Sequence, residues 1–357
     1  MPVVWLIDPY RAGERSQVTA LAEALGWGYK VKRLAYRKYE FFTNIFRGSN
    51  LRGIRLSESD ALQAPWPDLV ITAGMRNEPV CRWICEQSGG HTRIVHVGRP
   101  WANPECFDLV ITTPQYRLPR RPNVIQNALT LHQVSEERLA QAAAQWREQF
   151  AALPSPYTAV IVGGDSGPYA LGVRAARRLA SEVTELVATS GGSILVSTSS
   201  RTHPAVVAVL REALPEPLYF YQWQAGDENN PYFGLLALAQ QIVVTADSIS
   251  MLSEACATGK PVYMFDLARG AMAMDPAARR LPADNDWRLS TLAYRGLMRW
   301  VWQRLSRDIT LVHQRLADAG RAAWLGQPQL VATQSTQADL ERAVDAVQAM
   351  FDAGEQA

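Results

Sequence analysis

The stretch at residues 242–265 holds the densest group of chemical groups that could bind a phosphorylated ligand. Its apolar start predicts a strand, and a helix is expected to begin near Ser250. The first N–H groups of a helix lack partners within it and carry partial positive charge, so they attract phosphate. Glu254, one turn further, is placed to accept hydrogen bonds from a sugar diol; helix capping by the serines, with Glu254 in solvent, is the alternative. The candidate binding residues here are Asp247, Ser248, Ser250, Met251, Ser253 and Glu254.

Three other loops in this half of the chain follow predicted strands. The loop at 163–168 reads Gly-Gly-Asp-Ser-Gly-Pro and could bring a phosphate close to its backbone, although a tight strand-to-helix turn would need the same residues. An arginine after the next strand could neutralise a phosphate, while the hydroxyls beside it could equally cap a helix. An asparagine and a tyrosine precede another helix, and their place in the strand–helix order alone suggests contact with a nucleotide base. These candidates are Gly163, Gly164, Asp165, Ser166, Arg201, Asn230 and Tyr232.

The elements that must position these residues follow a regular alternation of strand and helix. Continuous apolar strands alternating with helices predict parallel sheets covered on both faces. A proline-rich break near residue 153 separates two such series. We therefore expect an α/β fold with two Rossmann-like domains, 1–152 and 153–287, facing a cleft, and C-terminal helices at 288–357 that pack across both. Ligands of such sheets bind beyond the carboxyl ends of the strands, here in the cleft.

The expected elements can be given by residue range. The strands are 3–7, 69–73, 94–97, 109–112, 159–162, 194–197, 218–221, 242–245 and 262–265. The helices are 17–25, 136–151, 170–188, 204–213, 232–240, 250–258, 287–314 and 339–351. The glycines at 26 and 259 are expected to end the helices before them.

Several segments carry a resemblance to a known family. Glu254-Ala255 followed by Gly259-Lys-Pro261 resembles the donor half of GT-B glycosyltransferases. Matching segments at 12–17, 67–74, 107–110, 161–164, 230–232 and 244–261 span most of the chain, and the last is the most specific. With these segments the chain resembles the plant elongated-mitochondria fission factors and their bacterial homologues, a GT-B-like family.

This resemblance implies roles for particular residues. Glu254 would hold the ribose of a nucleotide sugar, and the loop at 163–168 would hold its diphosphate. In inverting GT-B enzymes a His or a carboxylate of the acceptor domain takes the proton from the attacking hydroxyl. The loop at 8–14 offers Asp8 and Glu14 for this role. An ordinary turn residue and a favourable charge in a first helical turn are the alternatives for these two carboxylates.

The first loop also departs from the pattern of the family. Ser16 stands where most relatives have Asn, and Glu14 stands where many bacterial relatives have His. A histidine that ends another predicted strand could face the acceptor, although core packing explains it equally well. The acceptor-side candidates are Gly13, Gln17, Gly74 and His96.

Positive charge is concentrated in residues 29–55, which contain eight basic side chains, one acidic side chain and six aromatic rings. Basic residues mixed with aromatic ones are attracted to an anionic membrane surface. A solvated loop whose aromatic rings pack back on the domain is the alternative. The membrane-docking candidates are Lys30, Lys32, Arg33, Arg37, Lys38, Phe41, Phe42, Phe46 and Arg47.

The composition of the 357 residues excludes several classes of protein. The net charge is +2 and 48% of the residues are hydrophobic, which argues against a disordered chain and against a dedicated nucleic-acid binder. The sequence contains no apolar run long enough to span a membrane, and its first residues do not have the pattern of a signal peptide. The four cysteines have no metal-ligand or disulfide spacing, so no metal site is expected. Asp284-Asn-Asp286 matches a manganese-binding D-x-D pattern but does not follow a core strand.

These observations predict a cytoplasmic protein, with docking to the cytoplasmic face of a membrane as a further option. We expect a metal-independent GT-B glycosyltransferase that moves a sugar from a nucleotide diphosphate sugar to a lipid-linked or other membrane-associated acceptor. The nucleotide sugar is the substrate, and no cofactor is expected. The alternatives are a non-catalytic membrane-surface adaptor of the same fold and a nucleotide-sugar 2-epimerase.

Overall fold

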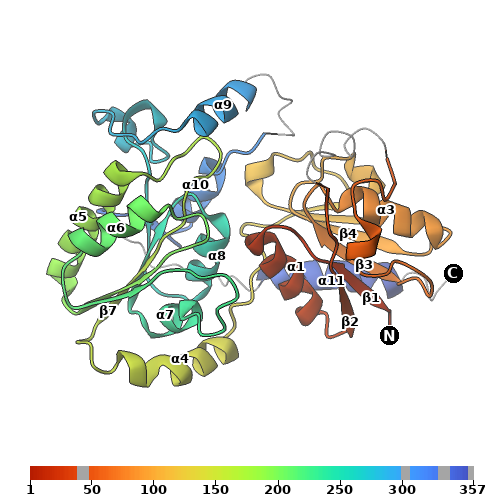
Figure 1. Cartoon of the computed structure of the whole chain (residues 1–357), viewed down its shortest axis with the longest axis horizontal. Coiled ribbons are helices and arrows are strands. Elements are labelled where there is room, and N and C mark those ends of the chain that lie inside the picture. Colours follow the sequence, from red (N-terminus) through yellow and green to blue (C-terminus); the bar gives the residue numbers. More distant parts are fainter. Residues whose placement is uncertain (38–47, 299–305, 329–337, 353–357) are drawn as a thin grey trace. The chain divides into compact units, whose positions relative to one another are not determined.

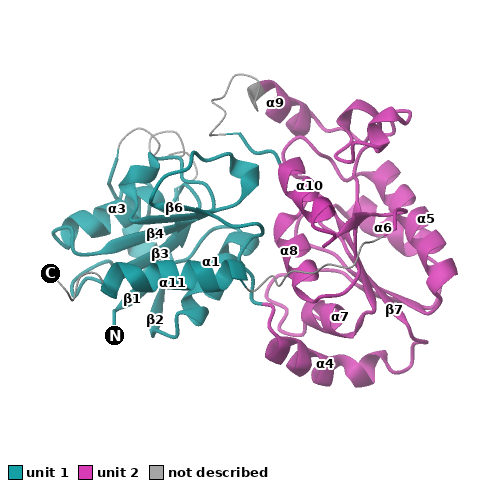
Figure 2. Cartoon of the chain, turned by 180° about the vertical axis from the view of Figure 1, so that it is seen from behind, with its two compact units in different colours: residues 1–133, 302–308, 336–357 teal, residues 134–301, 309–335 magenta. Residues whose placement is uncertain are grey.

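The computed structural model describes residues 1–37, 48–298, 306–328 and 338–352. The chain forms two compact units (Figures 1 and 2). Unit 1 comprises Met1–Gln133, Trp302–Asp308 and Thr336–Ala357, and unit 2 comprises Val134–Val301 and Ile309–Ser335.

Unit 1 is built on a six-stranded parallel sheet of order β2-β1-β3-β4-β5-β6. Successive side chains of β1 point to opposite faces, so Val4 and Leu6 pack on one side of the sheet and Trp5 and Ile7 on the other. Helices α1 and α11 cover the first face, and α3 covers the second. The strands are β1 (Val4–Ile7), β2 (Tyr29–Lys32), β3 (Leu69–Ala73), β4 (Arg93–Val97), β5 (Leu109–Thr112) and β6 (Val124–Gln126), and the helices are α1 (Ala12–Ala24), α3 (Glu78–Gln87) and α11 (Ala338–Asp352).

Unit 2 is built on a second six-stranded parallel sheet, of order β12-β11-β10-β7-β8-β9. The strand order changes direction between β7 and β10. The strands are β7 (Tyr157–Ile161), β8 (Ser193–Ser197), β9 (Leu218–Tyr221), β10 (Gln241–Thr245), β11 (Val262–Phe265) and β12 (Ala323–Trp324). The helices are α4 (Glu136–Phe150), α5 (Val173–Ser190), α6 (Pro204–Ala213), α7 (Tyr232–Leu238), α8 (Ile249–Ala257), α9 (Leu289–Met298) and α10 (Thr310–Asp318).

The expected fold class is confirmed, because both halves are Rossmann-like units with a parallel sheet and covering helices. The expected limits of strands β3, β5, β9 and β11 and of helix α6 match the structure to the residue. The glycines at 26 and 259 follow helices α1 and α8 and have positive φ angles of 67° and 70°. Glycine adopts this conformation without steric cost, so it ends a helix well.

The division of the chain differs from the expected one. The sequence suggested a break near residue 153, whereas the two units divide between Gln133 and Val134. Helix α4 therefore belongs to unit 2, where Trp146 packs against Gly234 of α7 so closely that a Cβ on the glycine would lie 2.5 Å from the indole. The proline-rich break near residue 153 therefore lies within unit 2, because the helix before it packs on the core of that unit.

The expectation of one continuous helix at 287–314 is wrong. Helix α9 ends at Met298 and α10 begins at Thr310, with the non-helical residues 306–308 before it. The C-terminal helices also pack separately: α11 buries Ala343 and Val347 in unit 1, and α10 buries Val312 in unit 2. Within the described residues, no helix is sufficiently long and apolar to cross a bilayer.

Candidate functional site

The loops at the carboxyl ends of β7, β8 and β10 meet where the strand order of unit 2 reverses. Such a reversal opens a crevice between the loops, and ligands of open α/β sheets bind there. Gly163 N–H donates to the Thr245 hydroxyl over 2.7 Å, which ties the loop after β7 to the end of β10. The Ser199 hydroxyl donates to the Gly163 carbonyl over 2.9 Å, which adds the loop after β8. The structure thus brings together loops that are far apart in the sequence.

Asp247 lies at the centre of these loops. Its side chain is fully buried, and Oδ2 accepts from Gly164 N–H at 3.0 Å and from Arg201 Nη1 at 2.8 Å. The same Arg201 nitrogen donates to the Asp165 carbonyl at 3.0 Å. Because the Arg201 side chain is 39% exposed, its guanidinium neutralises Asp247 and still reaches solvent. Arg201 can therefore contact an anionic ligand from a fixed position.

The two glycines of the loop after β7 are required by contacts inside the protein. A Cβ on Gly163 would lie 2.4 Å from Asp247 Oδ2, and a Cβ on Gly164 would lie 2.2 Å from the Arg201 carbonyl oxygen. These approaches leave no space for a side chain at either position. The glycines therefore serve the packing of three loops, whatever they offer to a phosphate.

The N-terminus of α8 opens beside this network. Ser248 is the N-cap residue, but its hydroxyl makes no capping bond. The N–H groups of Ile249, Ser250 and Met251 have no hydrogen-bond partner among the residues that the structure describes. Three unpaired N–H groups and the helix dipole are the features that can attract an anion to a helix start.

The N-terminus of α5, which follows the glycine loop, is already capped by the protein. The Asp286 carboxylate accepts from the N–H groups of Gly172, Arg174 and Ala175 at 2.9–3.3 Å. Asp284 accepts from Arg178 of the same helix. The D-x-D segment thus caps and anchors α5, and the described residues contain no group of three or more metal-ligating side chains.

Glu254 is buried, with 7% of its surface exposed, and its Oε2 accepts from the Tyr232 hydroxyl at 2.6 Å. Burial and the neighbouring carboxylate raise the pKa of Tyr232 well above its usual value. Asn230 accepts from Tyr232 N–H and so helps to start α7. The predicted residues 230, 232 and 254 therefore lie together.

Two residues of the α8 segment have roles inside the fold. The Ser253 side chain is fully buried and its hydroxyl donates to the Ile249 carbonyl at 2.8 Å. Lys260 donates to the carbonyls of Leu236 and Ala237 and so caps the C-terminus of α7; burial lowers its pKa to about 8. The Gly-Lys-Pro part of the segment thus has structural roles, since Gly259 follows the end of α8 and Lys260 caps the end of α7.

In unit 1, the strand order changes direction at β1 and β3, and the candidate proton acceptors lie there. Asp8 receives two hydrogen bonds from Arg15, at 2.5 and 2.9 Å, which hold it as an ion pair. Glu14 lies against Gly74: its Oε2 would be 2.8 Å from a Cβ on that glycine, whose φ angle is +80°. Burial raises the pKa of Glu14, while the charges of Arg11 and Arg307 oppose this shift. Of the two carboxylates, Asp8 is tied to Arg15, whereas Glu14 is the one whose pKa burial moves upward.

His96 is completely buried and contacts the Phe107 ring at 5.1 Å between centroids. Burial lowers the pKa of this histidine to about 3, so it is neutral. The buried Glu78 lies 3.6 Å away and accepts from the N–H groups of Trp101 and Ala102. This environment places His96 in the core, the alternative that the sequence left open.

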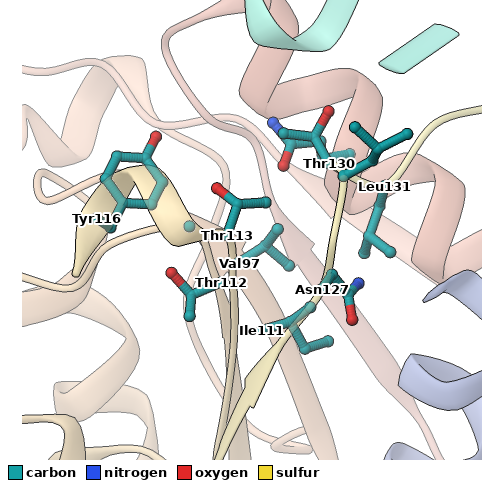
Figure 3. A pocket seen from close by; sticks show the side chains of 11 residues that line it. Val97, Ile111, Thr112, Thr113, Tyr116, Asn127, Thr130 and Leu131 are labelled. Atoms are coloured by element: carbon teal, nitrogen blue, oxygen red, sulfur yellow. The ribbon is translucent and has the colours of Figure 1, made fainter. Parts of the chain in front are cut away.

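Gln17 of α1 donates to the Gly13 carbonyl over 2.8 Å and borders a small cavity at the carboxyl ends of β4 and β5. The cavity has a volume of about 10 Å³, enough for one water molecule. Figure 3 shows Thr113, Tyr116 and Thr130 around it. A larger cavity of about 290 Å³ lies in unit 2, between α5 and the ends of β11 and β12, and contains no predicted site residue.

The described part of the basic segment lies at one edge of the sheet of unit 1. Lys30 and Lys32 belong to the edge strand β2; Lys30, Arg33 and Arg37 are exposed, and Lys32 is half-buried. The other docking candidates, Lys38, Phe41, Phe42, Phe46 and Arg47, lie outside the described residues.

Comparison with known proteins reveals relatives across most of the chain. The sequence model of a family described as "Mitochondrial fission ELM1" matches residues 12–325. The mitochondrial fission protein ELM1 of Arabidopsis thaliana is 30% identical over 60% of this chain and 55% of its own length, so the match spans about half of the plant protein. An uncharacterized protein of Rickettsia prowazekii is 24% identical over 73% of this chain and 82% of its own length.

Among solved structures, the S. aureus MnaA–UDP complex matches with a TM-score of 0.50 at 12% identity. The match covers 99% of this chain and 97% of that one. This likeness concerns the fold, which is the two-domain α/β class of the GT-B proteins.

Proposed function

Because the chain belongs to the mitochondrial fission ELM1 family, we propose that it is a GT-B glycosyltransferase. Unit 2 binds the diphosphate and ribose of a nucleotide-sugar donor. Unit 1 binds a membrane-associated acceptor, such as a cell-envelope glycolipid, at the cytoplasmic face of a membrane. The similarly folded S. aureus protein was solved with UDP, so UDP is the first nucleotide to test.

The observation that carries the proposal is the set of groups at the strand reversal of unit 2. The three unpaired N–H groups at the start of α8 receive the diphosphate, and Arg201 contacts it from its bond with Asp247. Glu254, oriented by Tyr232, accepts hydrogen bonds from the ribose hydroxyls. An adaptor without ligand would have no use for this combination of groups.

The reaction can be written with these residues. The acceptor hydroxyl oxygen forms a bond to the anomeric carbon of the sugar while the bond from that carbon to the diphosphate oxygen breaks. The hydroxyl proton passes to the Glu14 carboxylate, whose pKa is raised by burial and so lies nearer to neutral pH. The amides of α8 and Arg201 stabilise the negative charge that develops on the leaving diphosphate.

Thermal unfolding of the full chain with UDP, GDP, ADP, CMP and dTDP tests the donor site. A nucleotide at 100 times its dissociation constant stabilises the protein by about 2.7 kcal/mol, which raises Tm by several degrees. Glu254→Gln should reduce this shift, whereas Glu212→Gln, at an exposed position on α6 of the same unit, should leave it intact.

The results separate the proposed enzyme from its alternatives. If no nucleotide shifts Tm, the protein is the non-catalytic adaptor. This alternative agrees with the name of the plant relative, which is a fission protein. If UDP binds and the protein interconverts the sugar of UDP-GlcNAc without an acceptor, it is a 2-epimerase. If transfer to a lipid fraction occurs, Glu14→Gln should abolish it and keep the UDP-dependent Tm shift.

A further inference from the structure

Residues 306–308 belong to unit 1, although the helices on both sides of them in the sequence belong to unit 2. The Arg99 guanidinium donates to the Ser306 carbonyl at 2.7 Å, and Asp308 N–H donates to the Gln115 carbonyl at 2.8 Å. Arg307 donates from Nε to the Gln115 side chain at 2.7 Å. These bonds place Arg307 at the loops that follow β4 and β5.

Arg307 is near the candidate base. Its charge acts on the Glu14 carboxyl, as does that of Arg11, whose Nη1 lies 3.7 Å from Glu14 Oε1. Burial nevertheless raises the pKa of Glu14 despite these two arginines. One carboxyl therefore lies near two guanidinium groups, so positive charges outnumber negative ones among these three side chains.

Arg99 is held by aromatic rings beside the same segment. Its guanidinium carbon lies 5.4 Å from the centroid of Tyr116 and 5.7 Å from that of Trp101. The carboxylate near it, Glu78, is buried and already accepts two backbone N–H groups at 2.8 Å. A guanidinium that rests on aromatic faces keeps its planar edge of N–H groups directed at oxyanions.

The start of α1 adds two further donors. Arg11 is its N-cap residue and makes no side-chain capping bond, and the N–H groups of Ala12 and Gly13 have no partner within the described parts of the chain. This end of α1 lies where the strand order of unit 1 reverses, as the start of α8 does in unit 2. Glu14 therefore lies near Arg11 and Arg307 at this helix end, and Arg99 contacts the segment that contains Arg307.

We propose that the carboxyl-end loops of unit 1 bind a phosphate group, and that the acceptor of the transfer is a phosphorylated molecule. Arg99 and Arg307 bind its oxygens, and the start of α1 completes the site. Paired arginines recognise phosphate through parallel hydrogen bonds, a geometry that a neutral glycan does not need. The identity of the acceptor rests on the proposed function, but the phosphate site does not.

Titration of the full chain with inorganic pyrophosphate, followed by calorimetry, tests the site. Arg99→Gln and Arg307→Gln should each weaken binding by about tenfold or more, since each removes a charge-assisted contact. Arg307→Lys should recover part of the affinity. Arg93→Gln is the matched control, because this half-exposed arginine lies at the amino end of β4 and pairs with Asp108. The Tm of each variant shows whether it is folded.

A second arm identifies the source of the phosphate. Vesicles of phosphatidylcholine with about one fifth phosphatidic acid present the same group on a membrane. Binding that depends on Arg99 and Arg307 supports a lipid acceptor, and pyrophosphate binding alone supports a soluble one. The inference is overturned if pyrophosphate does not bind. It is also overturned if Arg201→Gln alone weakens pyrophosphate binding, a result that would still support the donor site of unit 2.

Discussion

Replacement of Asp247 by Ala is the sharpest test of the network at the strand reversal of unit 2. The substitution leaves the buried Gly164 N–H without its acceptor and leaves Arg201 without its counter-charge. A buried donor without a partner costs about 1–3 kcal/mol, and the half-exposed arginine adds less than about 1 kcal/mol because solvent screens it. We expect a loss of about 2–3 kcal/mol of unfolding free energy.

Calorimetry of the full chain measures this loss. At about 2–4 °C per kcal/mol for a unit of this size, Tm of unit 2 should fall by roughly 5–10 °C. Asp247→Asn keeps an oxygen that can accept from Gly164, so its fall should be less than half as large. Glu212→Ala, at an exposed position of the same unit, should change Tm by less than about 1 °C.

The outcome for nucleotide binding follows from the same geometry. If the network holds Arg201 toward the diphosphate, Asp247→Ala should also lose most of any UDP-dependent Tm shift. A Tm within about 2 °C of the wild type would refute the role of Asp247 in joining the loops. If Asp247→Asn lowers Tm as much as Asp247→Ala does, the stabilisation comes from the negative charge beside Arg201 and not from the acceptor for Gly164 N–H.

Three further predictions concern neighbouring features. Gly164→Ala should cost about 1–3 kcal/mol in calorimetry, because its Cβ would lie 2.2 Å from the Arg201 carbonyl, whereas Gly28→Ala, with open space around it, should be neutral. Asp286→Ala should destabilise by about 1–2 kcal/mol and speed amide hydrogen exchange in the first turn of α5, and unchanged exchange would contradict the capping role. Burial raises the pKa of Asp266 from 3.8 to about 6, so the folded state holds this proton more tightly than the unfolded chain does. The unfolding free energy should therefore fall as the pH rises from about 4 to 6. Urea titrations at several pH values should show this fall, and Asp266→Asn should flatten it.

Local sequence patterns predicted the elements that are long, apolar and bounded by turn residues. The limits of β3, β9 and β11 were correct because each run of apolar residues is followed directly by a glycine or a polar residue. The short edge strands β2, β6 and β12 were missed. Strand β2 has the sequence Tyr-Lys-Val-Lys and so resembles a basic surface segment, and β12 contains only two residues. Pairing with a neighbouring strand, and not composition, makes these segments strands.

The candidate site was predicted in its parts but not in its connections. Glu254, Arg201 and the start of α8 were named from residue types after strands, and the structure places them in unit 2 around the strand reversal. The Tyr232–Glu254 bond and the burial of Asp247 had no local signal, because their partners are 22 to 83 residues away. The nearest local signal was the pair Asn230 and Tyr232 at the start of α7.

The position of Arg307 in unit 1 was not predicted from the sequence. Its neighbours continue a helical pattern, so residues 287–314 were expected to form one helix. Instead, Arg99 donates to Ser306, and Gln115 accepts from Arg307 and Asp308. These bonds to residues about 200 positions earlier in the chain hold residues 306–308 in unit 1.

Composition and periodicity were thus sufficient for the α/β class and for the approximate position of most strands and helices, and short motifs were sufficient for the family resemblance. All of these depend on residues within a few positions of one another. The partner of each polar side chain, the division at Gln133 and the neutral state of the buried His96 depend on which distant segments pack together. Burial and hydrogen bonding act through space, so these properties arise only when the chain has folded.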